Sequence, residues 1–208
     1  WVGVAAFAAA ITHGSANGIA AAILNVAVLR AIMAGKVSQG NTIDAARVMA
    51  SDPASYGLLN VGEWLDGYDV DIEPGFTELA RLLDIAAKAL PGLQASPWGA
   101  AGDPSLKIGG GGWRAHECLA IALLACDTFP NDPWSSLRRS AATDGDSDTI
   151  AAVTGALLGA LYPTVFIEEW GQLRDRFEPR YVAWIENEAD HYQFAPERTS
   201  WLKRLLRR

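Results

Sequence analysis

Apolar residues recur at intervals of three and four along most of the chain, and short polar or glycine-rich segments separate these runs. Residues 18–34 form a long alanine-rich run that stops at Gly35, and the run that begins at Thr77 stops at Pro91. This spacing predicts helices, and glycine and proline are typical residues at helix ends. No segment shows the sustained two-residue alternation of a strand. The pattern therefore predicts an all-α fold, built as a compact multi-helix bundle.

The other segments complete the expected order of helices and loops. Residues 51–75 and 92–112 are rich in Gly, Pro and Asp, so we expect loops there. Helices are expected over residues 1–11, 43–50, 113–129, 149–161, 168–176 and 180–194, with two more that open at Pro133 and Pro196.

Two segments, 115–126 and 150–161, are apolar on almost all sides. A helix that is apolar all round is surrounded by other helices, so we expect both in the middle of the bundle. Gly155 and Gly159 lie on the second segment, where the lack of a side chain favours close approach of a neighbouring backbone.

The composition is that of a globular protein with an excess of negative charge. The chain has 208 residues, of which 50% are hydrophobic and 20% are charged, and its formal net charge is -7. This length suits one domain, so we expect residues 1–208 to form a single all-helical domain. Binding to a phosphate backbone requires clustered Lys and Arg, so the charge argues against a nucleic-acid partner.

The apolar beginning of the chain raises the question of a membrane. Polar residues interrupt it, so no apolar run approaches the roughly 18 residues of a spanning helix, and no basic segment precedes it as in a signal peptide. Cys118 and Cys126 lie on one expected helix, about 12 Å apart along its axis, which is too far for a disulfide. We expect a cytoplasmic protein without a membrane partner.

The most distinctive feature is the sequence TDGDSDT, Thr143 to Thr149, directly before the second apolar segment. Its carboxylates Asp144, Asp146 and Asp148 repel one another unless positive charge lies nearby. A helix amino terminus supplies about half a unit of positive charge. A divalent cation supplies more, and carboxylate and hydroxyl oxygens are the ligands that hard cations prefer. This stretch is therefore a candidate metal site.

Two other interpretations compete with a metal site that carboxylates from elsewhere in the fold would complete. The loop can be solvated, with Asp148 or Ser147 as a helix cap. The D-x-D-x-D spacing also matches the first half of an EF-hand calcium loop. However, Thr149 stands where that loop needs Gly, and Gly155 stands where it needs Glu. The apolar helix directly behind the loop favours the metal site, because it would anchor the ligands rigidly.

The stretch TDGDSDTIAAVTGALLGALY resembles the carboxyl-terminal signature of the ADP-ribosylglycohydrolase family. That signature runs roughly G-G-D-T-D-T and continues into a helix of small residues. The resemblance implies that Asp146, Asp148 and Thr149 are metal ligands. Asp144 departs from the first Gly of the signature, and Pro163 departs from the Gly that follows its tyrosine.

Other segments are similar to the same family. The glycine run before Trp113 resembles its glycine loop, and Thr12 with His13, ahead of an alanine-rich helix, resembles its T-H pair. The segment EEWGQLRDRFEPRYVAWIE is similar to the region that follows the signature in bacterial members. Taken alone, the glycine run suits a flexible surface loop and the histidine suits a turn. The resemblance instead implies substrate contacts from His13, Gly109, Gly110, Gly111 and Gly112.

The resemblance implies a hydrolase that removes ADP-ribose from modified protein side chains. The bond cleaved would be N-glycosidic, to arginine, or O-glycosidic, to serine. The partner would be an ADP-ribosylated protein or ADP-ribose itself. The implied cofactor is Mg²⁺, with two ions in the complete site and Mn²⁺ as a possible substitute, which would orient the ribose and a water at the anomeric carbon. No general acid or base is assigned, and Glu117 is only a distant candidate. His116, His191 and the basic carboxyl-terminal residues are expected on helix surfaces.

The family's G-D-x-x-G and T-D-D motifs do not occur in the chain, and in the family the second motif supplies the remaining metal ligands. The chain also begins with Trp1 instead of Met. We therefore expect that it is a carboxyl-terminal part, that an amino-terminal segment is a partner, and that the chain alone is inactive. Two alternatives stay open: a non-catalytic structural or ADP-ribose-binding relative, as among lens crystallins, and a hydrolase of a small ADP-ribose derivative.

Overall fold

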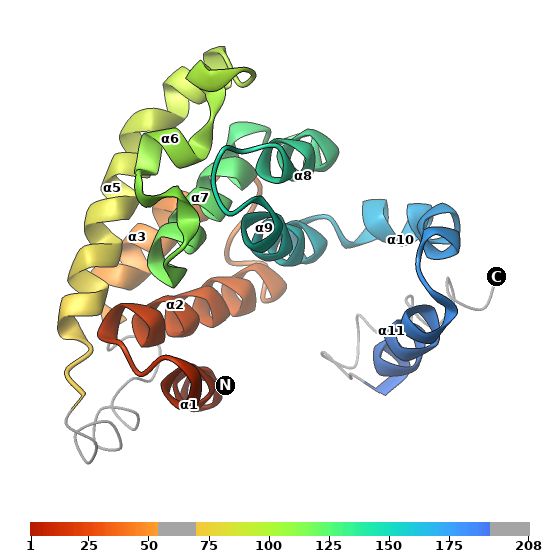
Figure 1. Ribbon diagram of the computed structural model, residues 1–208, viewed down its shortest axis with the longest axis horizontal. Coiled ribbons are helices and arrows are strands. Elements are labelled where there is room, and N and C mark those ends of the chain that lie inside the picture. Colours follow the sequence, from red (N-terminus) through yellow and green to blue (C-terminus); the bar gives the residue numbers. More distant parts are fainter. Residues whose placement is uncertain (54–69, 192–208) are drawn as a thin grey trace. The chain divides into compact units, whose positions relative to one another are not determined.

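The computed structural model describes residues 1–53 and 70–191, apart from the side chains of residues 167 and 188–191. All regular structure in these ranges is helical, so the predicted all-α fold is confirmed (Figure 1). The helix that was expected to open at Pro196 lies outside the described residues.

The chain divides into two compact units, Trp1–Leu161 and Tyr162–Arg208, and each is described by itself. The expectation of one domain over the whole chain stays a prediction. The α-helices of the first unit are α1 (Val2–Thr12), α2 (Ala16–Met33), α3 (Thr42–Ser51), α5 (Glu73–Ala95), α6 (Pro104–Ile108), α7 (Ala115–Thr128), α8 (Pro133–Ala141) and α9 (Ser147–Leu161), with 3-10 turns η2 (Ala100–Gly102) and η3 (Gly110–Gly112).

Helix α7 is the central helix of the first unit. Helices α2, α3, α5, α8 and α9 all pack against it (Figure 1). Every residue from His116 to Thr128 is buried, as the apolar character of this segment predicts. Cys118 and Cys126 are buried and free, so the expectation that they form no disulfide is confirmed.

Helix α9 was expected to be as central as α7, and this expectation is wrong. Ala152 and Ala156 are exposed, and a side chain at Gly159 would meet no atom within 4 Å. The small residues of this segment are apolar, but they bury little area, so the positions of the large residues decide which face packs. Those positions recur every three or four residues and form one buried face: Ile150, Thr154, Leu157, Leu158 and Leu161.

Helix α5 is longer at both ends than its sequence suggests. It begins at Glu73, whose N–H donates to the Asp71 carboxylate at 2.9 Å, and it continues past Pro91. Proline interrupts the hydrogen bonds of a helix, so tertiary contacts must stabilise the last turn. Leu93 is fully buried there, and the Gln94 side chain donates to a backbone carbonyl of α7 at 3.0 Å. The region expected to be a loop accordingly contains the end of α5, the short helix α6 and two 3-10 turns.

A buried carboxylate at the end of α7 fixes the start of α3. Asp127 accepts hydrogen bonds from the N–H of Thr42 at 3.1 Å, from its hydroxyl at 2.8 Å and from the N–H of Ile43 at 2.9 Å. These are N–H groups that the first turn of a helix cannot satisfy internally. Burial raises the pKa of Asp127, although the three hydrogen bonds favour its charged form. Asp127 therefore caps a helix from a neighbouring element.

Within the described ranges, α2 is the one unbroken helix that is long and apolar enough to cross a membrane by length and composition alone. Half of it is buried inside the first unit. Ile19, Ile23 and Leu24 are fully covered by protein, which is typical of a core helix.

The second unit consists, in its described part, of α10 (Pro163–Leu173), the 3-10 turn η4 (Arg174–Arg176) and α11 (Pro179–His191). Helix α10 begins five residues before the expected start at residue 168, because Pro163 occupies the first turn, where its missing N–H costs nothing. The Trp170 indole N–H donates to Glu186 at 3.3 Å, and Arg174 pairs with the same carboxylate at 3.2 Å. These contacts join the two helices of this unit.

Candidate functional site

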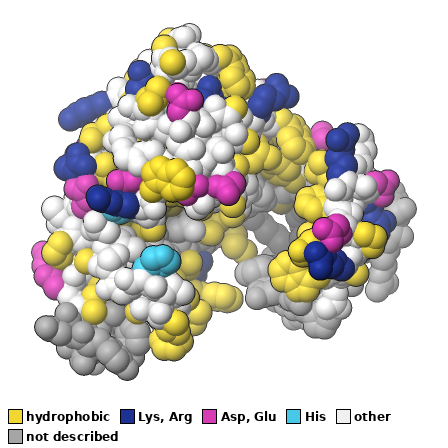
Figure 2. All heavy atoms as spheres, viewed as in Figure 1, with side chains coloured by type: hydrophobic (Ala, Val, Ile, Leu, Met, Phe, Trp, Pro, Cys, Tyr) yellow, Lys and Arg dark blue, Asp and Glu magenta, His cyan; other side chains and the backbone are white. Residues whose placement is uncertain are grey.

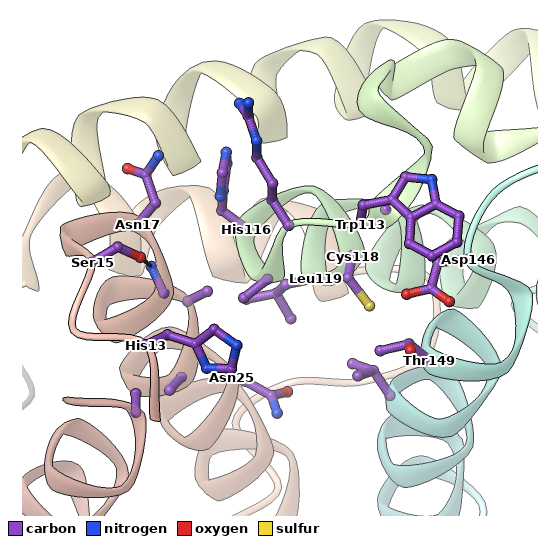
Figure 3. Close-up of a pocket in the computed structure, with 18 of the residues that line it drawn as sticks. His13, Ser15, Asn17, Asn25, Trp113, His116, Cys118, Leu119, Asp146 and Thr149 are labelled. Carbon is purple, nitrogen blue, oxygen red and sulfur yellow. Dashed lines mark hydrogen bonds between the residues drawn. The ribbon is translucent and has the colours of Figure 1, made fainter. Parts of the chain in front are cut away.

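A cavity of about 790 Å³ opens on the first unit, between the turn that joins α1 to α2, the start of α7 and the start of α9 (Figure 3). Its size lies within the range of about 300–1,000 Å³ that is usual for ligand sites. Polar side chains from all three segments border it: Thr12, His13, Ser15, Asn17, Asn25, Arg114, His116, Asp146 and Thr149. Figure 2 shows acidic, basic and histidine side chains gathered on one face of this unit.

The three residues predicted as metal ligands lie together at the start of α9. Asp146 and Thr149 border the cavity, and the Asp146 carbonyl accepts the N–H of Ile150 at 2.9 Å to begin the helix. Asp148 is exposed beside them and does not border the cavity, and it accepts the N–H of Thr149 at 2.8 Å. A hydrogen bond with the Asp146 carboxyl, followed by the one from Thr149, lowers the pKa of Asp148. The two carboxylates therefore lie next to each other.

The glycine run, Gly109 to Gly112, packs against the stretch from Thr143 to Thr149, which we call the acidic loop. The Gly111 carbonyl accepts the N–H of Asp146 at 2.7 Å, and a side chain at Gly145 would overlap that carbonyl. Gly110, Gly111 and Gly112 all have φ between 72° and 80°, a conformation that other residues rarely adopt. These glycines therefore form a compact turn that supports Asp146.

Of the four glycines that the family resemblance assigns to the substrate, Gly112 alone borders the cavity. Gly109, Gly110 and Gly111 do not border it, and a side chain at Gly110 would overlap the Glu117 carboxylate. The direct substrate contact predicted for these three glycines stays a prediction. Gly111 contacts the acidic loop, and Gly110 lies against Glu117 of α7.

His13 lies on the cavity wall opposite the acidic loop, as Figure 3 shows. Its ring Nδ1 is 3.0 Å from the Thr12 hydroxyl, which donates to the Ala8 carbonyl at 3.2 Å. The contact with Thr12 therefore orients the exposed histidine ring through its Nδ1 edge. The predicted role of His13 in substrate binding is compatible with this position.

His116 was expected on a helix surface, and this expectation is wrong. Its side chain is buried and borders the cavity, because the start of α7 lies against α5. Burial lowers the pKa of His116, and the nearby carboxylates of Glu117 and Glu78 only partly oppose this effect. The side chain of His191 lies outside the described part of the chain.

Glu117 does not border the cavity, so its position gives no support to a role as general acid or base. Its carboxylate accepts the N–H of Arg114 at 3.4 Å and lies 3.9 Å from the Arg114 guanidinium, at the first turn of α7. Such a residue three positions into a helix stabilises the helix start.

Two further residues of the cavity were missed from the sequence. The Asn25 side-chain oxygen is buried, borders the cavity and has no hydrogen-bond partner. Trp113 is 76% exposed and lies beside Asp146 at the cavity (Figure 3). An Asn inside an alanine-rich helix was the available signal for the first residue, because a buried amide needs a hydrogen-bond partner.

The donor atoms at the start of α9 fit Mg²⁺ in kind. Asp146, Asp148 and Thr149 offer carboxylate and hydroxyl oxygens, which are hard ligands, and two of the three face the cavity. Within residues 1–53 and 70–191, no group of three or more His, Cys, Asp or Glu side chains could hold a metal ion. A bound ion would therefore complete its coordination with water, substrate or residues beyond this part of the chain.

The first unit is thus an all-helical bundle with a polar cavity at the carboxylate-rich start of α9. The model of the ADP-ribosylglycohydrolase family matches residues 1–202, which is nearly the whole chain. The chain belongs to this family, and membership supports a glycohydrolase function. Comparisons with curated proteins and with solved structures gave no match.

Proposed function

We propose that the protein is a metal-dependent hydrolase that removes ADP-ribose from modified protein side chains, by cleaving the glycosidic bond at the anomeric carbon of the ribose. One observation carries this proposal: Asp146 and Thr149 border a cavity of about 790 Å³ and lie next to Asp148. Family membership supplies the reaction class.

Asp146, Asp148 and Thr149 would hold Mg²⁺ at the start of α9. When bound, the ion supplies positive charge that orients ribose hydroxyls and an attacking water. The amino terminus of α9 places the positive end of the helix dipole next to the two carboxylates. Neither the general acid nor the general base is assigned to a residue.

Other residues of the cavity suit different parts of an ADP-ribosyl group. The exposed ring of Trp113 offers a flat apolar face on which a base can stack. The unpaired oxygen of Asn25 can accept a hydrogen bond from a ribose hydroxyl, which would remove the cost of leaving it buried without a partner. His13 and Ser15 add polar groups at the same wall.

The test compares a double variant, which carries both Asp146→Asn and Asp148→Asn, with the single variant Asp144→Asn. Asp144 carries the same charge in the same loop, but it is exposed and is not one of the three proposed ligands. We expect the double variant to lose Mg²⁺-dependent release of ADP-ribose from ADP-ribosyl-arginine and ADP-ribosyl-serine peptides, whereas Asp144→Asn keeps it. Circular dichroism of each variant checks that the helical fold is intact.

Wild-type turnover by the double variant would contradict the metal assignment. Binding of ADP-ribose without turnover of either peptide would favour a non-catalytic relative. Turnover of free ADP-ribose derivatives but not of the peptides would favour a small-molecule hydrolase. The first result rejects the metal ligands, and each of the other two rejects the proposed reaction.

A further inference from the structure

Besides Asp127, a further buried carboxylate lies outside the cavity and contacts the acidic loop on the side away from the cavity. Asp103 precedes α6 and is 2% exposed. Its side chain accepts hydrogen bonds from the Thr143 hydroxyl and, at 2.8 Å, from the N–H of Asp144. It also accepts the N–H and the hydroxyl of Ser105, both at 2.9 Å. One carboxylate therefore joins the start of α6 to the start of the acidic loop.

Arg139 of α8 supplies the opposite charge. Its guanidinium lies 3.1 Å from the Asp103 carboxylate, and the same nitrogen donates to the Ala142 carbonyl at 2.7 Å. The arginine side chain is 6% exposed, so the ion pair is shielded from solvent. Ala142 is the residue that follows α8, so Arg139 fixes the point where the chain leaves that helix.

The far end of the loop is fixed as well. The N–H of Asp146 donates to the Gly111 carbonyl at 2.7 Å, and Gly145 packs against the same carbonyl. Every residue between Ala142 and Asp146 therefore contacts either the ion pair or the glycine turn. These contacts hold the backbone that carries the Asp146 carboxylate.

Resting on the proposed function, we propose that Asp103 and Arg139 are positioning residues, which hold the loop of Ala142 to Asp146 so that the Asp146 and Asp148 carboxylates converge on one cation. Neither residue borders the cavity, so neither contacts the substrate. They act through the backbone and through the Thr143 side chain. Residues that orient metal ligands in this way typically change metal affinity or activity by about 10–100-fold when they are mutated.

The central variant is Asp103→Asn, which keeps the size of the side chain but replaces one acceptor with a donor that faces Arg139 or the Asp144 N–H. Asp132→Asn is the matched control. Asp132 also accepts a backbone N–H at a helix start, that of Ser135 at 3.0 Å, but it contacts no residue of the acidic loop. The control therefore makes the same chemical change at a helix-capping carboxylate without touching the proposed positioning contacts.

Two readouts are made on the complete protein. Calorimetric titration with MgCl₂ measures metal affinity, and we expect Asp103→Asn to weaken it by about 10–100-fold while Asp132→Asn leaves it unchanged. Hydrogen exchange of the Asp144 and Asp146 amides measures the loop without metal. We expect exchange at least about tenfold faster in Asp103→Asn only, because local opening becomes easier.

Unchanged exchange and unchanged Mg²⁺ affinity in Asp103→Asn would overturn the positioning role. If Asp103→Asn fails to fold, Thr143→Val removes one hydrogen bond and keeps the ion pair. The same two changes are then expected with smaller size, and their absence overturns the role. If the wild type neither binds Mg²⁺ nor releases ADP-ribose, the proposed function fails, and exchange alone still decides whether Asp103 holds the loop.

Discussion

Two buried carboxylates perform the same structural task in different surroundings. Asp103 and Asp127 are 2% and 1% exposed, and each accepts backbone N–H groups from the start of a helix or loop. Burial by itself acts to raise the pKa of both carboxylates. At Asp103 the hydrogen bonds from Thr143, Asp144 and Ser105 outweigh burial, so its pKa is lowered. At Asp127 burial outweighs the hydrogen bonds, so its pKa is raised.

The difference shows what holds a charge inside this protein. Asp103 has a buried cation, Arg139, at 3.1 Å, whereas the nearby charge that acts on Asp127 is another carboxylate, Asp44, which raises its pKa further. Hydrogen-bond donors and a nearby cation both favour the charged form of a buried carboxylate, whereas burial and a neighbouring carboxylate favour the neutral form. The paired site supports the acidic loop of the candidate active site, and the unpaired site only joins α7 to α3.

The largest effect is expected from removing the cation. Arg139→Met leaves Asp103 buried without a charged partner, and such a loss costs about 3–5 kcal/mol of unfolding free energy. Urea denaturation of Arg139→Met against Arg138→Met measures it, because Arg138 is the exposed neighbour on the same helix. Equal midpoints for the two variants would show that the ion pair does not stabilise the fold.

A smaller effect is expected at the unpaired carboxylate. Asp127→Asn keeps one acceptor oxygen but leaves either Thr42 or Ile43 with an unsatisfied buried N–H, at a cost of about 1–3 kcal/mol. Denaturation should therefore show a loss below that of Arg139→Met, and hydrogen exchange should be faster at the start of α3. A larger loss than that of Arg139→Met would reverse the comparison.

The smallest and most specific effect is the pH dependence. Asp103 has a folded pKa below its ordinary value of 3.8, so its contribution to stability is present above that pH and is lost as pH falls through the folded pKa. Asp127 has a folded pKa above 3.8, so its contribution is present below that pH and is lost as pH rises through the folded pKa. Stability curves against pH check both directions.

The measured quantity is the difference in unfolding free energy between wild type and each Asn variant. For Asp103→Asn this difference should shrink as the pH falls below 3.8. For Asp127→Asn it should grow as the pH falls through the raised folded pKa towards 3.8, and should change no further below that value. Parallel curves for the two variants would mean that the two carboxylates have the same environment.

The sequence predicted the helical class and the central position of α7, because both depend on the spacing of apolar residues along one segment. It misjudged α9, because Ala152 and Ala156 count as apolar although they bury little area. The local motif brought Asp146, Asp148 and Thr149 to attention. The contacts of Asp103 with Arg139, Thr143 and Asp144 carry no local signal, since these partners lie 36 to 41 residues away in the chain.

His116 was misjudged for the same reason. Its burial depends on how the start of α7 lies against other helices, and a single polar residue near a helix start gives no indication of that packing. Local patterns therefore predict elements and candidate ligands. The residues that position those ligands become apparent only when the tertiary contacts are known.

The most direct measurement is the release of free ADP-ribose from an ADP-ribosylated protein by the complete wild-type protein, followed by mass spectrometry. The reaction is run after chelation with EDTA and again after Mg²⁺ is restored. The account predicts no release in EDTA and full release on addition of Mg²⁺, because the oxygen ligands at the start of α9 need the cation to act. Release at the same rate in EDTA, or none with Mg²⁺ restored, would contradict it.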